Sequence, residues 1–123
     1  HPNTFVKKSN GQIVKMKNIK QGDKLKNGKI VYATMIIHNL DENNNYIEKF
    51  YSLKNGEKNS PILVTGSHLI FDKSINYFIP VKKYGAPIST ISSDTLVCLI
   101  TSDHTIPLGK YIFHDWEDNN ESI

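Results

Sequence analysis

Short apolar runs separated by turn residues make up most of the sequence. Within these runs the residues either alternate between apolar and polar or stay apolar throughout, as in the β-strands of a folded core. No window sustains apolar residues at the spacing of an amphipathic helix. We therefore predict an all-β fold with strands at residues 4–6, 13–16, 30–31, 50–53, 62–64, 77–79, 95–100 and 111–113.

Turn signals lie between several of these strands. Asn-Gly pairs accept the positive φ angles that tight hairpins need, and they occur at Asn10-Gly11, Asn27-Gly28 and Asn55-Gly56. Residues 41–45 predict a polar loop tip. Pro80 and Pro107 favour edge strands or turns over the centre of a sheet, because proline cannot donate a ladder hydrogen bond.

The length of 123 residues predicts one domain. A hydrophobic content of 38% and a charged content of 22% are ordinary for a folded chain. We assign residues 1–118 to this domain and residues 119–123 to a loosely held tail. No apolar run has membrane-spanning length, and no leader-like segment is evident, so we expect no membrane association.

The basic residues bear on a nucleic-acid partner, and the cysteine content bears on the cellular compartment. The basic side chains are all lysines, and arginine is the side chain suited to bidentate phosphate and guanine contacts. We therefore predict no nucleic-acid partner. The single cysteine, Cys98, cannot form an internal disulfide, which leaves the cellular compartment open.

A candidate catalytic pattern is the run Thr65-Gly66-Ser67-His68, which follows an apolar strand. Such a turn can aim a hydroxyl, an imidazole and backbone N–H groups at one point, where they polarise a carbonyl or donate a proton. The structural alternative is a hydroxyl-stabilised turn followed by a histidine that only ends the strand.

Two further patterns frame this one. A tight turn at Gly22-Asp23 precedes it. After it, His104 and the pair His114-Asp115 lie at the ends of neighbouring predicted strands. Taken singly, these residues fit an ordinary turn and ordinary surface histidines.

In this order and at these separations, the patterns resemble the Hint superfamily, which includes inteins and hedgehog autoprocessing domains. Residues 1–6 resemble the stretch after the family's nucleophilic cysteine, and the Gly22-Asp23 turn resembles its early turn. Thr65 and His68 match its Thr-x-x-His motif. Residues 97–104 resemble its late strand, and residues 113–115 resemble its apolar-His-Asn ending. The hedgehog-like and Vint branches are the most similar. The resemblance implies a compact horseshoe of short strands and hairpins with pseudo-two-fold subdomains.

The resemblance also implies self-processing without a cofactor or metal. A cysteine attacks the carbonyl before it in an N-to-S acyl shift, and the thioester is resolved by water, a thiol or a sterol. By this comparison Thr65 holds the scissile amide and His68 protonates the departing amine. Asp41 takes the place of a hedgehog general base, with His38 as the alternative. The substrate is the domain's own N-terminal flanking polypeptide, and we expect a monomer.

This sequence departs from the family pattern at both ends. The expected nucleophile lies two residues before His1, and Cys98 is a poor substitute because burial in an apolar run raises a thiol pKa. Asp115 stands where splicing domains carry asparagine, and it lacks the amide nitrogen that closes a succinimide. Trp116 offers no hydroxyl or thiol. The sequence therefore predicts N-terminal cleavage without full splicing.

Other classes of function stay open. A catalytically inert β-barrel interaction module explains the hairpins equally well. A metal site is a weaker alternative, because the histidines do not show the short spacing typical of metal ligands. A hydrolase with Ser67 as nucleophile is weaker still, because the sequence shows neither a nucleophile elbow nor an acid to pair with the histidine.

Overall fold

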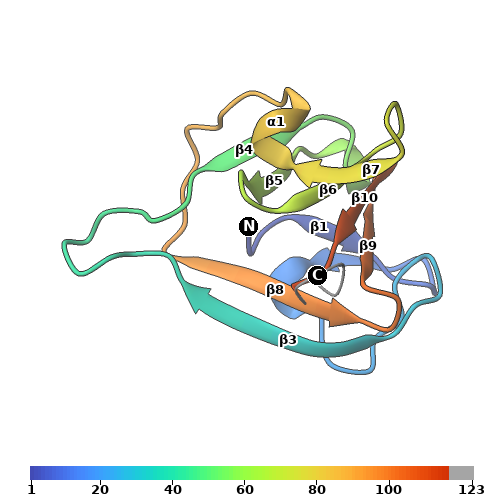
Figure 1. Cartoon of the computed structure of the whole chain (residues 1–123). Helices are drawn as coiled ribbons and strands as arrows, with labels where there is room; N and C mark the ends of the chain where they lie inside the picture. Colours follow the sequence, from blue (N-terminus) through green and yellow to red (C-terminus); the bar gives the residue numbers. More distant parts are fainter. Residues whose placement is uncertain (117–123) are drawn as a thin grey trace, which may run out of the picture.

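The computed structural model describes residues 1–116, and its architecture is built from short β-strands (Figure 1). The strands are β1 (Phe5–Lys7), β2 (Ile13–Lys15), β3 (Val31–His38), β4 (Phe50–Leu53), β5 (Ile62–Thr65), β6 (Leu69–Asp72), β7 (Tyr77–Pro80), β8 (Thr95–Thr101), β9 (Thr105–Leu108) and β10 (Tyr111–His114). The helical segments are η1 (Met16–Asn18), η2 (Glu57–Asn59) and α1 (Val81–Tyr84). The all-β prediction is confirmed. The predicted tail and the predicted domain end at residue 118 lie outside the described residues.

The strands form one four-stranded sheet, ordered β7-β6-β10-β9, and three two-stranded ribbons, β1-β2, β3-β8 and β4-β5. In Figure 1 the segment from β4 to α1 forms the upper part of the molecule and the β3-β8 ribbon its lower side, with β1 between them. Pro80 and Pro107 fall in β7 and β9, the two edges of the four-stranded sheet, as predicted. Strands β6 and β9 were not expected as strands from the sequence.

The β3-β8 ribbon is the longest pairing, running from Val31 opposite Thr101 to His38 opposite Thr95. Side chains of β3 alternate between the core and solvent along its whole length. The strand predicted at residues 30–31 is therefore only the start of β3. This ribbon places His38 and the residues of β8 on one side of the functional cavity described below.

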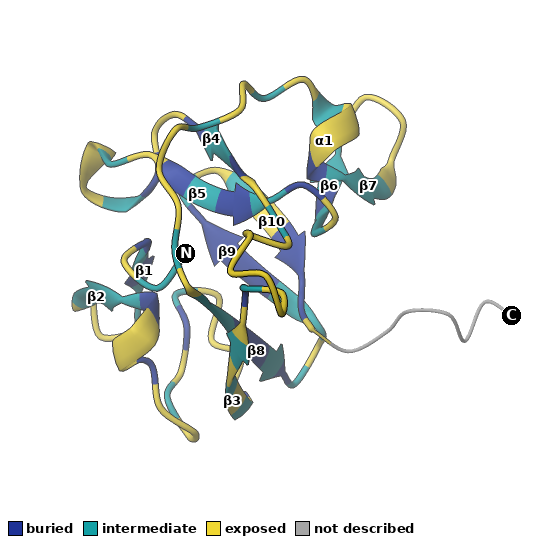
Figure 2. Ribbon diagram, turned by 90° about the vertical axis from the view of Figure 1, so that its left-hand side faces the viewer, coloured by how far each residue is buried: buried dark blue, intermediate teal, exposed yellow. Residues whose placement is uncertain are grey.

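The core lies where the ribbons meet the four-stranded sheet. Figure 2 shows many of the buried residues in β5, β9 and β10. Val6, Leu25, Ile62, Ile70 and Phe113 are almost fully buried there and belong to one apolar cluster. Because both early and late strands contribute, the first and last strands pack into the same core.

The Asn-Gly pairs form the predicted turns. Gly11 and Gly28 adopt φ angles of +86° and +81°, and Asn55 adopts +65°. Positive φ at these positions favours glycine and asparagine. The first of these turns sets the β1-β2 register, in which Val6 lies opposite Val14.

Candidate active site

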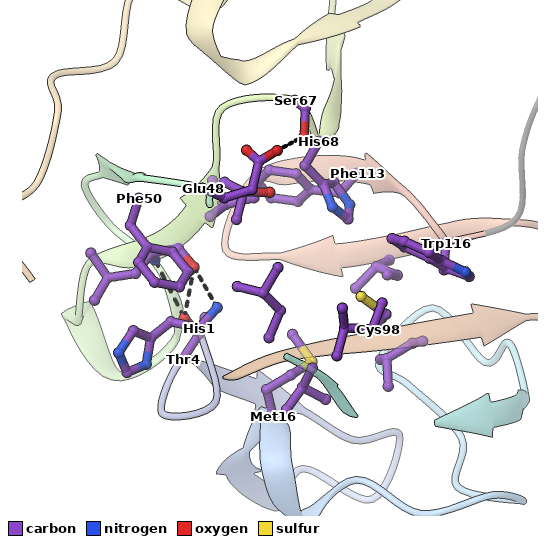
Figure 3. A pocket seen from close by; sticks show the side chains of 18 of the residues that line it. His1, Thr4, Met16, Glu48, Phe50, Ser67, His68, Cys98, Phe113 and Trp116 are labelled. Carbon is purple, nitrogen blue, oxygen red and sulfur yellow. Dashed lines mark hydrogen bonds between the residues drawn. The ribbon is translucent and has the colours of Figure 1, made fainter. Parts of the chain in front are cut away.

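One cavity of about 580 Å³ opens among the ribbons, and residues from both ends of the chain line it (Figure 3). This volume is typical of small-ligand sites. Its walls are mostly apolar, and Phe50, Ile62 and Leu99 contribute to them. The polar groups include His1, Thr65, His68, His114 and Asp115. The predicted motif thus faces both the start of the chain and its last described residues.

The turn that carries Thr65 and His68 joins β5 to β6 and is closed by the N–H of His68, which donates to the Thr65 carbonyl at 3.2 Å. Gly66 is required within it by space. A Cβ at this position would lie 2.6 Å from Cε1 of the Tyr51 ring. Only glycine therefore lets the turn approach β4 so closely.

The start of α1 holds the same turn from its other side. The N–H of Val81 donates to the His68 carbonyl at 2.8 Å, and the N–H of Lys82 donates to the Gly66 carbonyl at 2.9 Å. The turn is therefore fixed by two backbone hydrogen bonds from the start of α1, which pre-organises the groups it carries.

The His68 imidazole is oriented by the last strand. Its Nε2 lies 2.7 Å from the backbone carbonyl of His114, and its ring packs edge-on against Phe113 at 5.9 Å. Because a carbonyl only accepts, Nε2 carries the proton of this hydrogen bond. Burial lowers the pKa of His68 below its ordinary value of 6.5, although the bond to His114 opposes this shift. The neutral ring therefore leaves Nδ1 as an acceptor.

Asp115 forms the centre of a second polar cluster. Its carboxylate is fully buried and accepts the N–H of Thr101 at 2.9 Å. One carboxylate oxygen lies 3.1 Å from Nδ1 of His104, and the other lies 3.6 Å from Nδ1 of His114. The two imidazoles stack almost parallel, with centroids 6.1 Å apart. The cluster ties the end of β10 to the β8-β9 turn.

Backbone contacts complete that anchor. The N–H of Asp115 donates to the His104 carbonyl at 2.9 Å, and the N–H of Trp116 donates to the Leu99 carbonyl at 2.8 Å. His104 itself has a positive φ of +64°, which few residues other than glycine adopt. The described end of the chain is thus held beside β8, and the His114 carbonyl is fixed for His68.

The start of the chain lies against β5. The terminal amino group of His1 donates to the Leu63 carbonyl at 2.8 Å, and Thr4 Oγ1 contacts both the N–H and the carbonyl of Leu63. The His1 ring packs against Phe50, with centroids 4.9 Å apart. Burial lowers the pKa of His1, and a contact with the Ser92 carbonyl partly opposes this. His1 was not among the predicted site residues.

The predicted acidic candidate Asp41 lies away from these groups. It is exposed, and its Oδ1 accepts the N–H groups of Asn43 and Asn45 at 2.8 and 2.9 Å, as expected of a loop tip. It does not line the cavity, whereas His38 does. His104 does not line the cavity either, and it meets the site through Asp115. The geometry thus brings together Thr65, His68, His114 and Asp115.

Glu48 is a cavity residue that sequence reasoning missed. Its Oε2 accepts a hydrogen bond from the Ser67 hydroxyl at 3.3 Å, so it touches the Thr65–His68 turn from the part of the cavity wall that precedes β4 (Figure 3). No local pattern marks it, because a single charged residue before a strand has no distinctive spacing.

Asn39 positions that wall. Its buried amide donates to the carbonyls of Glu48 and Ser93 at 3.1 and 3.0 Å, and its Oδ1 accepts the N–H of Glu48 at 2.8 Å. The connections before β4 and before β8 are thereby joined. A buried asparagine with all three contacts satisfied gives a rigid junction.

Cys98 lies in β8 and also lines the cavity. Burial raises the pKa of its thiol to about 11, as its apolar surroundings predict. At neutral pH it is a protonated, weakly nucleophilic group.

Residues 1–116 contain neither a cluster of metal ligands nor a membrane-spanning helix. In this part of the chain no three side chains of His, Cys, Asp or Glu gather as a metal ion would require. No helix there is long and apolar enough to cross a membrane.

Comparison with known proteins identifies the fold. No protein-family model matches the sequence, and no curated protein matches it significantly. Two crystal structures of the MchDnaB-1 intein, one of them a variant, each align over 93% of this chain with a TM-score of 0.56 and 14% identity. The alignments cover 97% and 98% of those chains. The chain therefore has the fold of these intein structures, in agreement with the resemblance of its motifs.

Proposed function

We propose that this domain cleaves the peptide bond at its own N-terminal junction through an N-to-S acyl shift. The observation that supports this most directly is the shared cavity of His1, Thr65 and His68, with His68 oriented by the His114 carbonyl. The fold likeness to an intein agrees with it. In this proposal the substrate is the flanking polypeptide, and the nucleophile is a cysteine two residues before His1.

The proposed reaction begins with attack of that cysteine's sulfur on the carbonyl carbon of the residue before it. The thiol proton passes to Nδ1 of His68, which is unprotonated because Nε2 carries the proton donated to His114. The carbon–nitrogen bond then breaks, and the same proton passes from His68 to the departing amine. The products are a thioester and a free amine. His68 thus acts first as base and then as acid.

Thr65 supports this step through its backbone as well as its hydroxyl. In our proposal the Thr65 side chain holds the scissile amide, while N–H groups of the turn stabilise the charge that develops on the carbonyl oxygen. The two backbone hydrogen bonds from α1 and the close packing of the turn on the Tyr51 ring keep these groups in place during the reaction.

The thioester is resolved in this proposal by water, a thiol or a sterol, as in hedgehog-like domains, and not by splicing. Asp115 has no side-chain nitrogen with which to attack its own carbonyl. Its carboxylate is instead committed to Thr101 and His104. The amide nitrogen that closes a succinimide at the C-terminal side of splicing domains is therefore missing at this position.

A reporter-fused precursor tests the proposal. A reporter, the cysteine and one further residue are placed ahead of His1, and reporter release with dithiothreitol is followed on a gel. We expect release by the unaltered precursor, none when the added cysteine is replaced by alanine, and a loss of about 100-fold in His68→Ala. Cys98→Ser is the matched control and should cleave normally.

Two outcomes contradict the proposal in different ways. Unchanged release in His68→Ala would remove that histidine from the chemistry. A folded precursor that releases no reporter would instead favour the inert interaction module.

A further inference from the structure

The edge of β5 that faces the cavity has the geometry of a strand-docking site. We infer that the two residues directly upstream of His1 bind there as an added antiparallel strand, so that backbone pairing places the scissile bond that precedes them. This inference rests on the proposed function and specifies how its substrate is held. It is supported by the ladder register, the contacts of His1 and the position of the cavity.

The register of β4 and β5 shows which groups point outward. Phe50 lies opposite Thr65, and Ser52 lies opposite Leu63. The Phe50 carbonyl and the Ser52 N–H bond outward, to Ser89 and Pro87 at 2.9 Å each. In a non-hydrogen-bonded pair of an antiparallel ladder, the backbone N–H and carbonyl groups of both residues point away from the partner strand. The N–H and carbonyl groups of Leu63 and Thr65 therefore lie on the edge of β5 that faces away from β4.

The start of the chain already uses this edge. The His1 nitrogen donates to the Leu63 carbonyl at 2.8 Å, and this nitrogen becomes a peptide N–H when residues precede it. Leu63, Val64 and Thr65 all line the cavity together with His1. The space beside the edge, from Leu63 toward Thr65, is thus open to an incoming strand.

The pairing fixes a register for the upstream residues. His1 contributes only its nitrogen to this edge, because its carbonyl accepts the Thr4 N–H at 3.0 Å and the Leu63 N–H contacts Thr4 Oγ1 at 3.3 Å. Antiparallel ladders repeat every two residues, so an upstream strand that continues from the His1 contact places the residue two before His1 opposite Thr65. That residue lies about 7 Å along the strand, within the cavity. Its N–H faces the Thr65 carbonyl, and its carbonyl faces the Thr65 N–H. This N–H is the scissile amide of the proposed cysteine.

The register also links the substrate to His68. The Thr65 carbonyl that faces the scissile amide accepts the His68 N–H at 3.2 Å, so both groups meet at one backbone atom. The chain turns at Gly66, which ends the ladder one residue after Thr65. Residues before the scissile bond therefore have no β5 partner, and we expect cleavage to tolerate many side chains there.

Proline at two adjacent positions tests the register. Proline removes an N–H, so His1→Pro removes the donor to Leu63, whereas proline at the residue directly before His1 removes an N–H that points away from β5. Measured against His1→Ala, which keeps the N–H but loses the ring, we expect His1→Pro to slow release about tenfold or more. The other proline should slow it about threefold at most.

Hydrogen exchange supplies a measurement that needs no cleavage. In a precursor whose added cysteine is alanine, the Thr65 amide should exchange at least about tenfold more slowly than in the 1–123 chain, because the added strand accepts its proton. The Val64 amide, which faces Tyr51 in the β4-β5 ladder of both proteins, is the control.

Failure of the inference is distinguishable from failure of the proposed function. Normal cleavage with equal effects of both prolines and unchanged Thr65 exchange would overturn strand docking alone. A precursor with a protected Thr65 amide that releases no reporter would support docking and contradict the chemistry.

Discussion

Adding a single methyl group at Gly66 should slow cleavage by more than it destabilises the folded protein. In Gly66→Ala the new Cβ would lie 2.6 Å from Cε1 of Tyr51, about 0.8 Å inside the 3.4 Å at which ordinary contact begins. It would also lie 3.3 Å from Cβ of Lys82. Because Lys82 is also close, we expect the strain to displace the Tyr51 ring or the turn.

The magnitude follows from overpacking a close contact. Such a substitution costs about 1–3 kcal/mol of unfolding free energy, which for a domain of this size lowers Tm by about 4–12 °C. Displacing the turn by about 1 Å would misplace His68 relative to the His114 carbonyl and slow cleavage by about 100-fold. We therefore expect cleavage to fall by more than the loss of folded protein explains.

The assay pairs thermal unfolding with reporter release in Gly66→Ala, Tyr51→Leu and the double variant. Removing the ring should relieve the overlap, so the double variant should be more stable and faster than the sum of the single effects predicts. A Gly66→Ala protein with unaltered Tm and rate would refute the packing argument. Additive losses in the double variant would show that Tyr51 is not the obstacle.

The remaining predictions concern buried polar groups. Because burial lowers the folded-state pKa of His68, its contribution to stability is complete above pH 6.5 and is lost as the pH falls below that value, by at most about 1.4 kcal/mol per pH unit. Urea unfolding of wild type and His68→Gln across this range should show the difference shrinking toward acid, and a difference independent of pH would contradict the assignment. Asn39→Ala should lower the free energy of unfolding by about 2–4 kcal/mol, because it leaves the Glu48 N–H and two carbonyls without their side-chain partner, whereas Asn43→Ala at the exposed loop tip should change it little. With a thiol pKa of about 11, Cys98 should react with iodoacetamide at pH 8 roughly 100-fold more slowly than a free cysteine peptide, and comparable rates would contradict its burial.

The strands that the sequence predicts are those in which turn chemistry and apolar runs agree. Asn10-Gly11 and the edge prolines are local signals, and the structure bears them out. Most of β3 was not predictable because its solvent face is apolar as well: Tyr32 is 55% exposed and Ile36 75% exposed. With apolar residues on both faces, no alternation marks a strand, and an apolar run without alternation does not distinguish a strand from a buried helical segment.

The candidate site divides in the same way. Thr65, His68, His114 and Asp115 were found because their order along the chain resembles a known pattern, and the fold gathers them at one cavity. Glu48 and the amino group of His1 reach the site through contacts with residues distant in sequence, Ser67 and Leu63, which no local spacing predicts. The role assigned to Asp41 depends on a loop whose length differs freely between related folds, and its carboxylate bonds within that loop.

The edge proline of β7 has a consequence for solubility. Exposed strand edges invite pairing between molecules, and Pro80 lacks an N–H that an incoming strand at the β7 edge of the four-stranded sheet could use. The other edge strand, β9, is covered instead, because Pro107 is buried and β9 contacts β1. The edge of β5 carries no proline and faces the cavity beside His1, so it stays receptive to a tethered strand. A Pro80→Val variant should aggregate at lower concentration than the wild type, as measured by light scattering.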